Sequence, residues 1–161
     1  VMKRWYGAQF YLQRLLAVRR IVGEDVAIFT DYMVGFPSET DEQFEESWRF
    51  AQEMGFAGMH IFRYSPREGT PAAAMSPVYA LDEVEDRIKK VRELDALWRR
   101  RYASRFEGRP MQVLRESRKE QVWSGHSSNF LKTKLPINIE AGWQTVKIAR
   151  AEGEVLIAHG L

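Results

Sequence analysis

The stretch from Ile28 to Thr40, which reads IFTDYMVGFPSET, constrains the fold of this chain more than any other segment. A run of aromatic and aliphatic residues ends at a Gly-Phe-Pro turn, and a polar patch then leads into an amphipathic segment. This order is typical of a buried strand followed by a helix. Alternation along the strand places Ile28, Thr30, Tyr32 and Val34 on one face and Phe29, Asp31, Met33 and Gly35 on the other. The second face ends where α/β proteins usually bind their ligands, at the carboxyl end of a strand.

The residues up to Tyr64 predict an alternation of helices and strands. The predicted elements are a helix over Gln9–Arg20 that ends at Gly23, a strand over Val26–Val34, a helix from Thr40 to Gly55, and a strand over Met59–Tyr64. Thr40 and Gln43 have the spacing of a helix capping box. The connections are short, as a parallel sheet of α/β type requires. His60 has no second ligand at a suitable spacing, so a structural histidine is favoured over a metal ligand.

The segment Ser65–Pro71 reads SPREGTP and is predicted to be a loop, because two prolines and a glycine restrict its backbone. It follows the second strand as Gly35–Thr40 follows the first. The two loops are therefore expected to meet at one edge of the sheet, where Arg67 and Thr70 can hold an anion or a ribose. The alternative for Arg67 is a surface arginine that pairs with a helix carboxylate.

The spacing of apolar residues changes at residue 108, from a helical period to short alternating segments. Apolar residues recur at every third or fourth position over 82–106, which predicts one long helix, and Gly108 to Pro110 end it. Five short alternating segments follow, at Met111–Glu116, Gln121–Ser124, Asn129–Leu135, Gln144–Ala151 and Glu154–His159. Strands of this length and spacing predict a small antiparallel β-barrel of the oligonucleotide-binding type. We therefore expect two domains, residues 1–107 and residues 108–161.

Arginines alternate with aromatic residues near the end of the long helix. The arginines are Arg99, Arg100, Arg101, Arg105 and Arg109, and the aromatic residues are Trp98, Tyr102 and Phe106. Arginine beside aromatic side chains suits nucleic acid. The aromatic residues are also four positions apart, as in the buried stripe of a helix whose arginines face solvent. The two interpretations are compatible with each other.

Composition excludes several classes of site. The chain of 161 residues has no cysteine, so it cannot itself form disulfides, thiolate zinc sites or a cysteine-bound iron–sulfur cluster. It has neither a run of about 18 apolar residues nor a signal peptide at its start, which predicts a soluble cytoplasmic protein without a membrane partner. The first residue is Val1, and the chain is expected to be part of a longer protein.

Two long motifs resemble those of the radical S-adenosylmethionine tRNA methylthiotransferases. They are DYMVGFPSETDEQF, from residue 31, and HIFRYSPREGTPAA, from residue 60. The final segment, with GHSSNFLK from residue 125, resembles the TRAM domain that these enzymes use to hold tRNA. The resemblance implies the carboxyl-terminal part of a partial (β/α) barrel followed by a small OB-like barrel. His60 and the SNFLK run favour the branch that acts on threonylcarbamoyl-adenosine.

The resemblance also implies cofactors, partners and site residues. By resemblance, S-adenosylmethionine would contact Met33, Gly35, Phe62, Arg63 and Tyr64, and the place of Asp31 on the same strand face adds it to the cofactor-binding residues. The TRAM-like segment would contact substrate RNA through Asn129, Phe130 and Lys132. The loop position adds Arg67 and Thr70 to the substrate-binding residues, and the arginine–aromatic pattern adds Arg99, Arg100, Arg101 and Arg105. The family's [4Fe–4S] clusters would be held by cysteines upstream, so no catalytic or metal-binding residue is assigned in this chain. Ser38 and Glu68 stand where the family usually has glycine and proline, which puts the two loop conformations in question.

The activity implied is addition of a methylthio group to a modified adenosine next to the tRNA anticodon, with tRNA and the missing amino-terminal part of the same protein as partners. The sequence leaves three alternatives open. One is the related branch that modifies a ribosomal protein. The second is an RNA-binding module without chemistry, made of the basic helix and the barrel. The third is an α/β domain with an appended barrel of another function.

Overall fold

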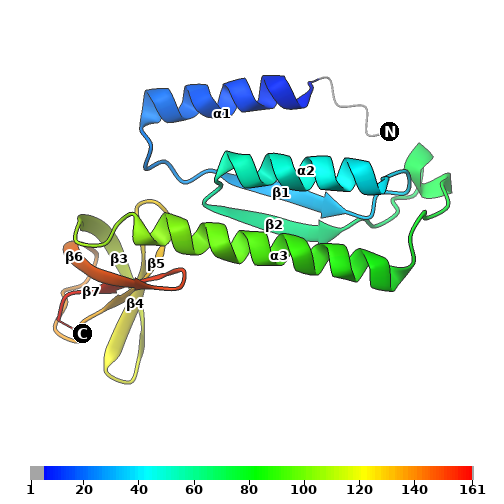
Figure 1. The fold of residues 1–161 in the computed structure, drawn as a ribbon. Coiled ribbons are helices and arrows are strands. Elements are labelled where there is room, and N and C mark those ends of the chain that lie inside the picture. Colours follow the sequence, from blue (N-terminus) through cyan, green and yellow to red (C-terminus); the bar gives the residue numbers. More distant parts are fainter. Residues whose placement is uncertain (1–5, 161) are drawn as a thin grey trace. The chain divides into compact units, whose positions relative to one another are not determined.

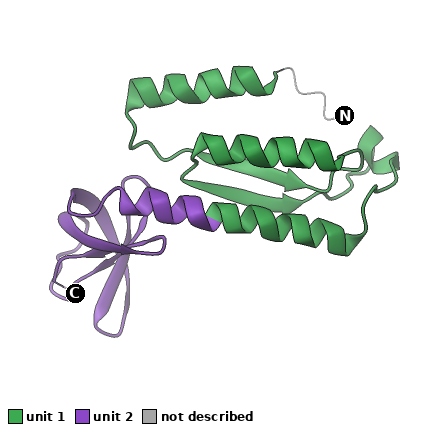
Figure 2. Ribbon diagram, viewed as in Figure 1, with its two compact units in different colours: residues 1–95 green, residues 96–161 purple. Residues whose placement is uncertain are grey.

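The computed structural model describes residues 6–160, and the chain folds into two compact units, residues 1–95 and residues 96–161 (Figures 1 and 2). The long helix α3, Leu81–Ser104, contributes residues to both units. The unit boundary therefore lies within α3, and the domain boundary expected at residue 107 stays a prediction. Among the described residues, no helix is both long and apolar enough to cross a membrane.

The first unit contains the predicted alternation of helices and strands (Figure 1). Its elements are α1, Ala8–Val22; β1, Phe29–Val34; α2, Asp41–Met54; β2, Gly58–Arg63; and a 3₁₀ helix, Pro71–Ala74, followed by the start of α3. Strands β1 and β2 are parallel, as predicted, and pair from Phe29 with Gly58 to Val34 with Arg63. The prediction was wrong about the start of β1, because Val26 to Ile28 lie before the first ladder pair. The 3₁₀ helix was not predicted.

Helix α2 begins and ends at the residues that the sequence indicated. The backbone N–H of Gln43 donates to Thr40 Oγ1 over 3.3 Å, and Gln43 Oε1 accepts from the Thr40 N–H over 3.2 Å. These reciprocal bonds form the predicted capping box. Gly55 ends the helix with a left-handed φ of 60°, a conformation that glycine adopts without steric cost. The buried residues of α2 are Phe44, Ala51 and Met54.

The two faces of the β1–β2 sheet differ, as the alternation predicted. Tyr32, Val34 and Met59 are buried on one face. The other face is open, with 37% of Phe29 and 47% of Phe62 exposed. Helix α3 adds Val84, Ile88, Val91 and Leu94 to the core of this unit, at the spacing of a single helical stripe.

The second unit consists of the end of α3 and a closed five-stranded barrel with the order β3-β4-β5-β7-β6. The strands are β3, Pro110–Lys119; β4, Val122–Ser127; β5, Lys132–Leu135; β6, Trp143–Glu152; and β7, Val155–Ala158. The prediction of five strands is confirmed. The core of the second unit contains Val113, Leu135, Ile148, Leu156 and Ile157, together with Tyr102 and Phe106 from the residues before β3.

Two predictions about the barrel were wrong in detail. The barrel is not wholly antiparallel, because β5 and β7 pair in parallel. A ring with an odd number of strands cannot alternate direction throughout, so at least one neighbouring pair must be parallel. The strand predicted from Asn129 begins only at Lys132. Phe130 has a φ of +66°, which is incompatible with an extended strand, and residues 128–131 form a turn instead.

Candidate functional site

The open face of the β1–β2 sheet holds most of the predicted cofactor residues. Asp31 lies opposite His60, and Met33 lies opposite Phe62. Directly paired residues project to the same side of a sheet, so these four side chains share the open face with Phe29. The face thus presents aromatic, thioether, carboxylate and imidazole groups from two adjacent strands.

A depression of about 330 Å³ lies at the carboxyl ends of both strands. It is lined by Met33, Phe62, Arg63, Tyr64, Ser65, Arg67, Thr70 and Ala72. Six of these residues were predicted from the sequence, four for the cofactor and two for substrate. The structure therefore brings the loop after β2 together with the end of β1, as the parallel arrangement required.

The polar groups of this depression have different partners. The Arg63 guanidinium lies 3.6 Å from the Glu85 carboxylate of α3, in an exposed ion pair. Thr70 Oγ1 donates to the Arg67 carbonyl over 2.7 Å, which closes the loop on itself, and the Arg67 side chain is exposed. The Tyr64 hydroxyl is buried without a hydrogen-bond partner among the described residues. Arg67 is thus an exposed cation beside the depression, whereas the Tyr64 hydroxyl is closed off from solvent.

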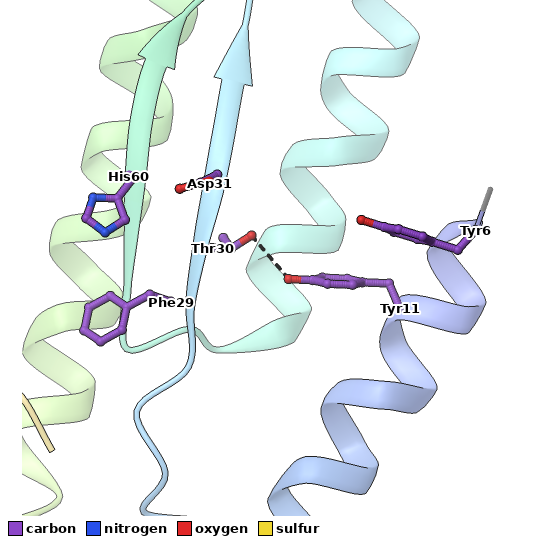
Figure 3. A pocket seen from close by; sticks show the side chains of 6 residues that line it. All are labelled: Tyr6, Tyr11, Phe29, Thr30, Asp31 and His60. Atoms are coloured by element: carbon purple, nitrogen blue, oxygen red, sulfur yellow. Dashed lines mark hydrogen bonds between the residues drawn. The ribbon is translucent and has the colours of Figure 1, made fainter. Parts of the chain in front are cut away.

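Asp31 lies apart from this set, in a neighbouring depression of about 470 Å³ (Figure 3). Asp31, His60 and Phe29 line it from the strands, and Tyr6 and Tyr11 line it from the other side. Figure 3 shows Thr30 turned toward Tyr11, and their hydroxyls are 3.3 Å apart. Asp31 and His60 therefore form a pair of exposed polar side chains, two residues before the strand-end pair Met33 and Phe62.

Gly35 has a packing role in this structure. Its φ is +78°, and a Cβ at this position would lie 3.0 Å from Val84 Cγ1 of α3. Its N–H donates to Glu39 Oε2 over 3.1 Å. Glycine is needed here for the turn and for the close approach of α3, and its contact with a cofactor stays a prediction. Ser38 and Glu68, the two departures from the family pattern, are not among the described non-glycine residues with a positive φ.

Sequence analysis missed the residue that fixes the loop after β1, which is Arg87 on α3. Its Nη1 donates to Glu39 Oε2 over 3.0 Å, and its Nη2 donates to Asp41. The guanidinium carbon lies 3.7 Å from the centre of the Tyr79 ring. Only 9% of the Arg87 side chain is exposed. A signal was present, since residue 87 falls on the same helical stripe as Val84, three positions earlier.

Tyr32 lies on the covered face of the sheet, close to this group of charges. Burial raises the pKa of its phenol, and the carboxylates of Glu39 and Glu45 raise it further. The phenol is therefore neutral at physiological pH. Its hydroxyl is buried without a hydrogen-bond partner among the described residues.

The predicted RNA-binding residues lie in the second unit, apart from Arg67 and Thr70. Tyr102 and Phe106 are buried, and Arg105 and Arg109 lie over their rings at 5.9 and 5.2 Å. Both rings are therefore buried and both arginines exposed, as the interpretation of a buried stripe expected, but Phe106, Arg105 and Arg109 lie after the end of α3. Binding of RNA by the arginines stays a prediction, because the two interpretations are compatible.

The remaining arginines differ in their partners. Arg99 lies 3.5 Å from Glu154 at the β6–β7 turn, and Arg101 lies 5.1 Å from the centre of the Trp98 ring. Arg100 is exposed. Asn129 Nδ2 donates to the Tyr102 hydroxyl over 3.0 Å, so the end of α3 is hydrogen-bonded to the turn that carries Phe130 and precedes Lys132. The two predicted groups of RNA-binding residues are therefore neighbours in this unit.

Metal ligation was not predicted within this chain. Among the described residues, no group of three or more histidine, aspartate or glutamate side chains is arranged to hold a metal ion.

Comparison with curated proteins identifies relatives over most of the chain, although no model of a protein family matches it. The chain is 33% identical over 141 residues, 81% of its length, to threonylcarbamoyladenosine tRNA methylthiotransferase of Bacillus subtilis. It is 32% identical over 168 aligned residues, 99% of its length, to tRNA-2-methylthio-N(6)-dimethylallyladenosine synthase of Bacillus cereus. The synthase of the same name from Staphylococcus saprophyticus is 38% identical over 144 residues.

These matches cover 30%, 32% and 27% of the three relatives, so the chain spans about a third of their length. Within the matched residues lie both strand-end motifs, the long helix and the barrel, since one alignment extends over 99% of the chain. The chain belongs to the tRNA methylthiotransferase family.

Proposed function

We propose that this chain is the carboxyl-terminal part of a radical S-adenosylmethionine enzyme that adds a methylthio group to a modified adenosine next to the tRNA anticodon. The observation that supports this most directly is the depression at the strand ends, where six residues predicted for cofactor and substrate meet. The relatives named for this activity support the same proposal. The longer protein would act in the cytoplasm, and its amino-terminal part would pack on the open sheet of residues 1–95.

The depression fits the adenosine end of S-adenosylmethionine. The Met33 thioether and the half-exposed Phe62 ring offer apolar surfaces to a purine. The Tyr64 hydroxyl is buried without a partner in the described residues, and a movement of this side chain on binding would let it hydrogen-bond a ribose or ring nitrogen. The guanidinium of Arg67, on the exposed loop after β2, can pair with a negatively charged group of the ligand. We assign binding and orientation to these residues, and we keep Asp31, in the neighbouring depression, and Gly35, in the turn after β1, as further proposed contacts of the cofactor.

The residues of this chain do not fit an iron–sulfur cluster. Such a cluster is held by cysteine thiolates, and the chain has none. In our proposal the cluster ligands are cysteines of the amino-terminal part, which also supplies the redox chemistry. The role that we propose for residues 1–95 is to hold the nucleoside end of the cofactor, and the role of the barrel unit is to hold RNA.

The proposal can be tested in cells by disrupting the gene of the longer protein and analysing the nucleosides of total tRNA by mass spectrometry. We expect one 2-methylthio-modified adenosine to disappear and its unthiolated precursor to accumulate. Unchanged tRNA together with loss of a methylthio group from a ribosomal protein would favour the related branch. Unchanged methylthiolation of both would favour an RNA-binding module without chemistry.

The isolated chain is expected to be catalytically inactive. After anaerobic incubation with iron and sulfide it should bind no brown chromophore, because histidine, carboxylate and thioether groups are poor substitutes for thiolates. With S-adenosylmethionine and a strong reductant it should form no 5′-deoxyadenosine above the buffer control, measured by liquid chromatography. Formation of this nucleoside by the cysteine-free chain would refute our assignment of roles.

RNA binding by the barrel unit is expected to depend steeply on salt. Arg100 and Arg101 lie near the end of α3, and each phosphate that an arginine neutralises adds to the slope of log affinity against log salt. Reversing both charges, with Arg100→Glu and Arg101→Glu, should flatten this slope by about two, measured by filter binding of tRNA at several salt concentrations.

The control for the charge reversal is Arg20→Glu, an exposed position on α1 in the other unit, which should leave the slope unchanged. Equal slopes for the parent and the double variant would show that the proposed surface is wrong.

A further inference from the structure

Phe130 combines two features that are rarely found together. Its side chain is 73% exposed, and its backbone φ is +66°. A bulky residue in the left-handed region is strained, and such strain persists only where surrounding contacts over-determine the conformation. The other described non-glycine residue with a positive φ is Glu120, in the β3–β4 hairpin turn. An exposed phenylalanine gains nothing for the fold from this strain, so the contacts that impose it require an explanation.

Ser127 fixes the turn through hydrogen bonds to the three residues 129–131. Its N–H donates to the Leu131 carbonyl over 2.9 Å, and its carbonyl accepts from the Phe130 N–H over 2.9 Å. Its Oγ accepts from the Leu131 N–H over 3.0 Å and donates to Asn129 Oδ1 over 2.6 Å. Ser127 is almost fully buried, at 3% exposure. The backbone on both sides of Phe130 is therefore fixed by one buried serine.

Asn129 connects this turn to the end of α3. Its Nδ2 donates to the Tyr102 hydroxyl over 3.0 Å, while its Oδ1 accepts from Ser127. Tyr102 is itself anchored, because its ring is buried and meets the Phe106 ring edge-on at 5.2 Å. Tyr102, Asn129 and Ser127 form a continuous chain of hydrogen bonds, which we name the turn support. It joins the buried Tyr102 ring to the residues on both sides of Phe130 in the chain.

Charged side chains of both signs belong to the residues around the supported turn. Lys132 is exposed two residues after Phe130, and the Arg105 guanidinium lies 5.9 Å from the centre of the Tyr102 ring. His126, opposite Lys132 in the β4–β5 ladder, has its Nδ1 2.8 Å from the Glu116 carboxylate. An exposed aromatic ring with an exposed lysine two residues away offers the two kinds of group that proteins use to stack a nucleobase and to neutralise its phosphate.

We propose that Phe130 stacks on an unpaired RNA base and that Ser127, Asn129 and Tyr102 are positioning residues that hold its ring in place. This inference rests on the proposed RNA binding and narrows it to a single-stranded element. Within a duplex, both faces of an internal base are already covered by neighbouring bases. A protein ring can therefore stack only on a base in a loop, bulge or end.

The test uses the intact chain and two RNAs of equal length, a stem-loop with unpaired loop bases and a fully paired duplex. Phe130→Ala should weaken binding of the stem-loop about tenfold, and duplex binding should not change. The salt slope should also stay unchanged, because no charge is removed. Trp143→Ala, which removes another exposed aromatic ring of the same barrel, is the matched control and should not affect binding of either RNA.

The positioning role is tested with Tyr102→Phe, which removes a single hydroxyl and leaves the buried ring in place. Loss of its hydrogen bond to Asn129 should weaken stem-loop binding about fivefold. The same change should have no effect in the Phe130→Ala background, because the hydroxyl acts through the ring of Phe130. Ser127→Ala should behave in the same way, with thermal unfolding of the barrel recorded for each variant.

Each outcome decides one claim. Stem-loop binding by Phe130→Ala at the parent's affinity would overturn the stacking role while leaving RNA binding intact. Additive effects of Tyr102→Phe and Phe130→Ala would overturn the positioning role alone. If the parent chain binds neither RNA in a salt-dependent manner, the RNA-binding part of the proposed function fails as well.

Discussion

Replacing Gly125 by alanine is expected to unfold the barrel while residues 1–95 keep their structure. A Cβ at this position would lie 1.8 Å from the Leu114 carbonyl oxygen and 2.8 Å from its carbonyl carbon. Both atoms are backbone, so no side-chain rotation can relieve the contact. The β3 backbone comes this close because β3 has a bulge between Arg115 and Ser117, across from Gly125. We expect a loss of stability of more than about 4 kcal/mol.

Amide hydrogen exchange measured residue by residue can detect this outcome in each unit. The amides of β5 and β7 should lose their protection in Gly125→Ala, and those of β1 and β2 should keep it. Gly153→Ala is the control, since φ at Gly153 is +65° but nothing lies within 4 Å of the added Cβ. Its cost should be limited to about 1–2 kcal/mol of backbone strain. Normal protection of the barrel in Gly125→Ala would show that β3 does not pass over Gly125 as described.

Arg87→Ala is expected to destabilise the first unit by about 3–5 kcal/mol. The substitution leaves the Glu39 carboxylate, whose side chain is 12% exposed, without its guanidinium partner. Only the hydrogen bond from the Gly35 N–H then remains among the contacts described for this carboxylate. Because Glu39 holds that N–H, the loop next to the proposed adenosine site should also become more mobile.

The matched control for this prediction is Arg63→Ala. Its pair with Glu85 spans 3.6 Å, and the two side chains are 50% and 54% exposed. Loss of a surface pair of this kind should cost about 0–1 kcal/mol. Chemical denaturation followed by hydrogen exchange in β1 and β2 measures both variants. Adding Glu39→Gln to Arg87→Ala should restore part of the loss, and equal stability of the two arginine variants would contradict the role of Arg87.

The features that could be predicted from the sequence are those with local signals. The capping box at Thr40 marks the start of α2, and the glycines at positions 23 and 55 mark the ends of α1 and α2. Residue alternation indicated the five barrel strands. The strand-end residues Met33, Phe62, Arg67 and Thr70 came together because the carboxyl ends of parallel strands meet at one edge.

The features that could not be predicted depend on tertiary contacts. The parallel β5–β7 pair follows from closing a ring of five strands, which no local pattern records. The turn at Asn129 was mistaken for a strand because its alternation was intact, while the buried Ser127 Oγ binds the backbone in another conformation. The requirement for glycine at position 125 depends on the path of β3, which is close in space but distant in sequence.

The parallel pair also determines when the barrel can form during protein synthesis. It joins β5 to β7, and β7 is the last of the five strands to leave the ribosome. At about 5–20 residues per second, the nascent chain spends roughly a few seconds with β4 and β5 made and the ring still open. During that interval β5 has an unpaired edge. A chain that ends before β7 should therefore aggregate more readily than one with the closed barrel, because the edge of β5 then stays unpaired.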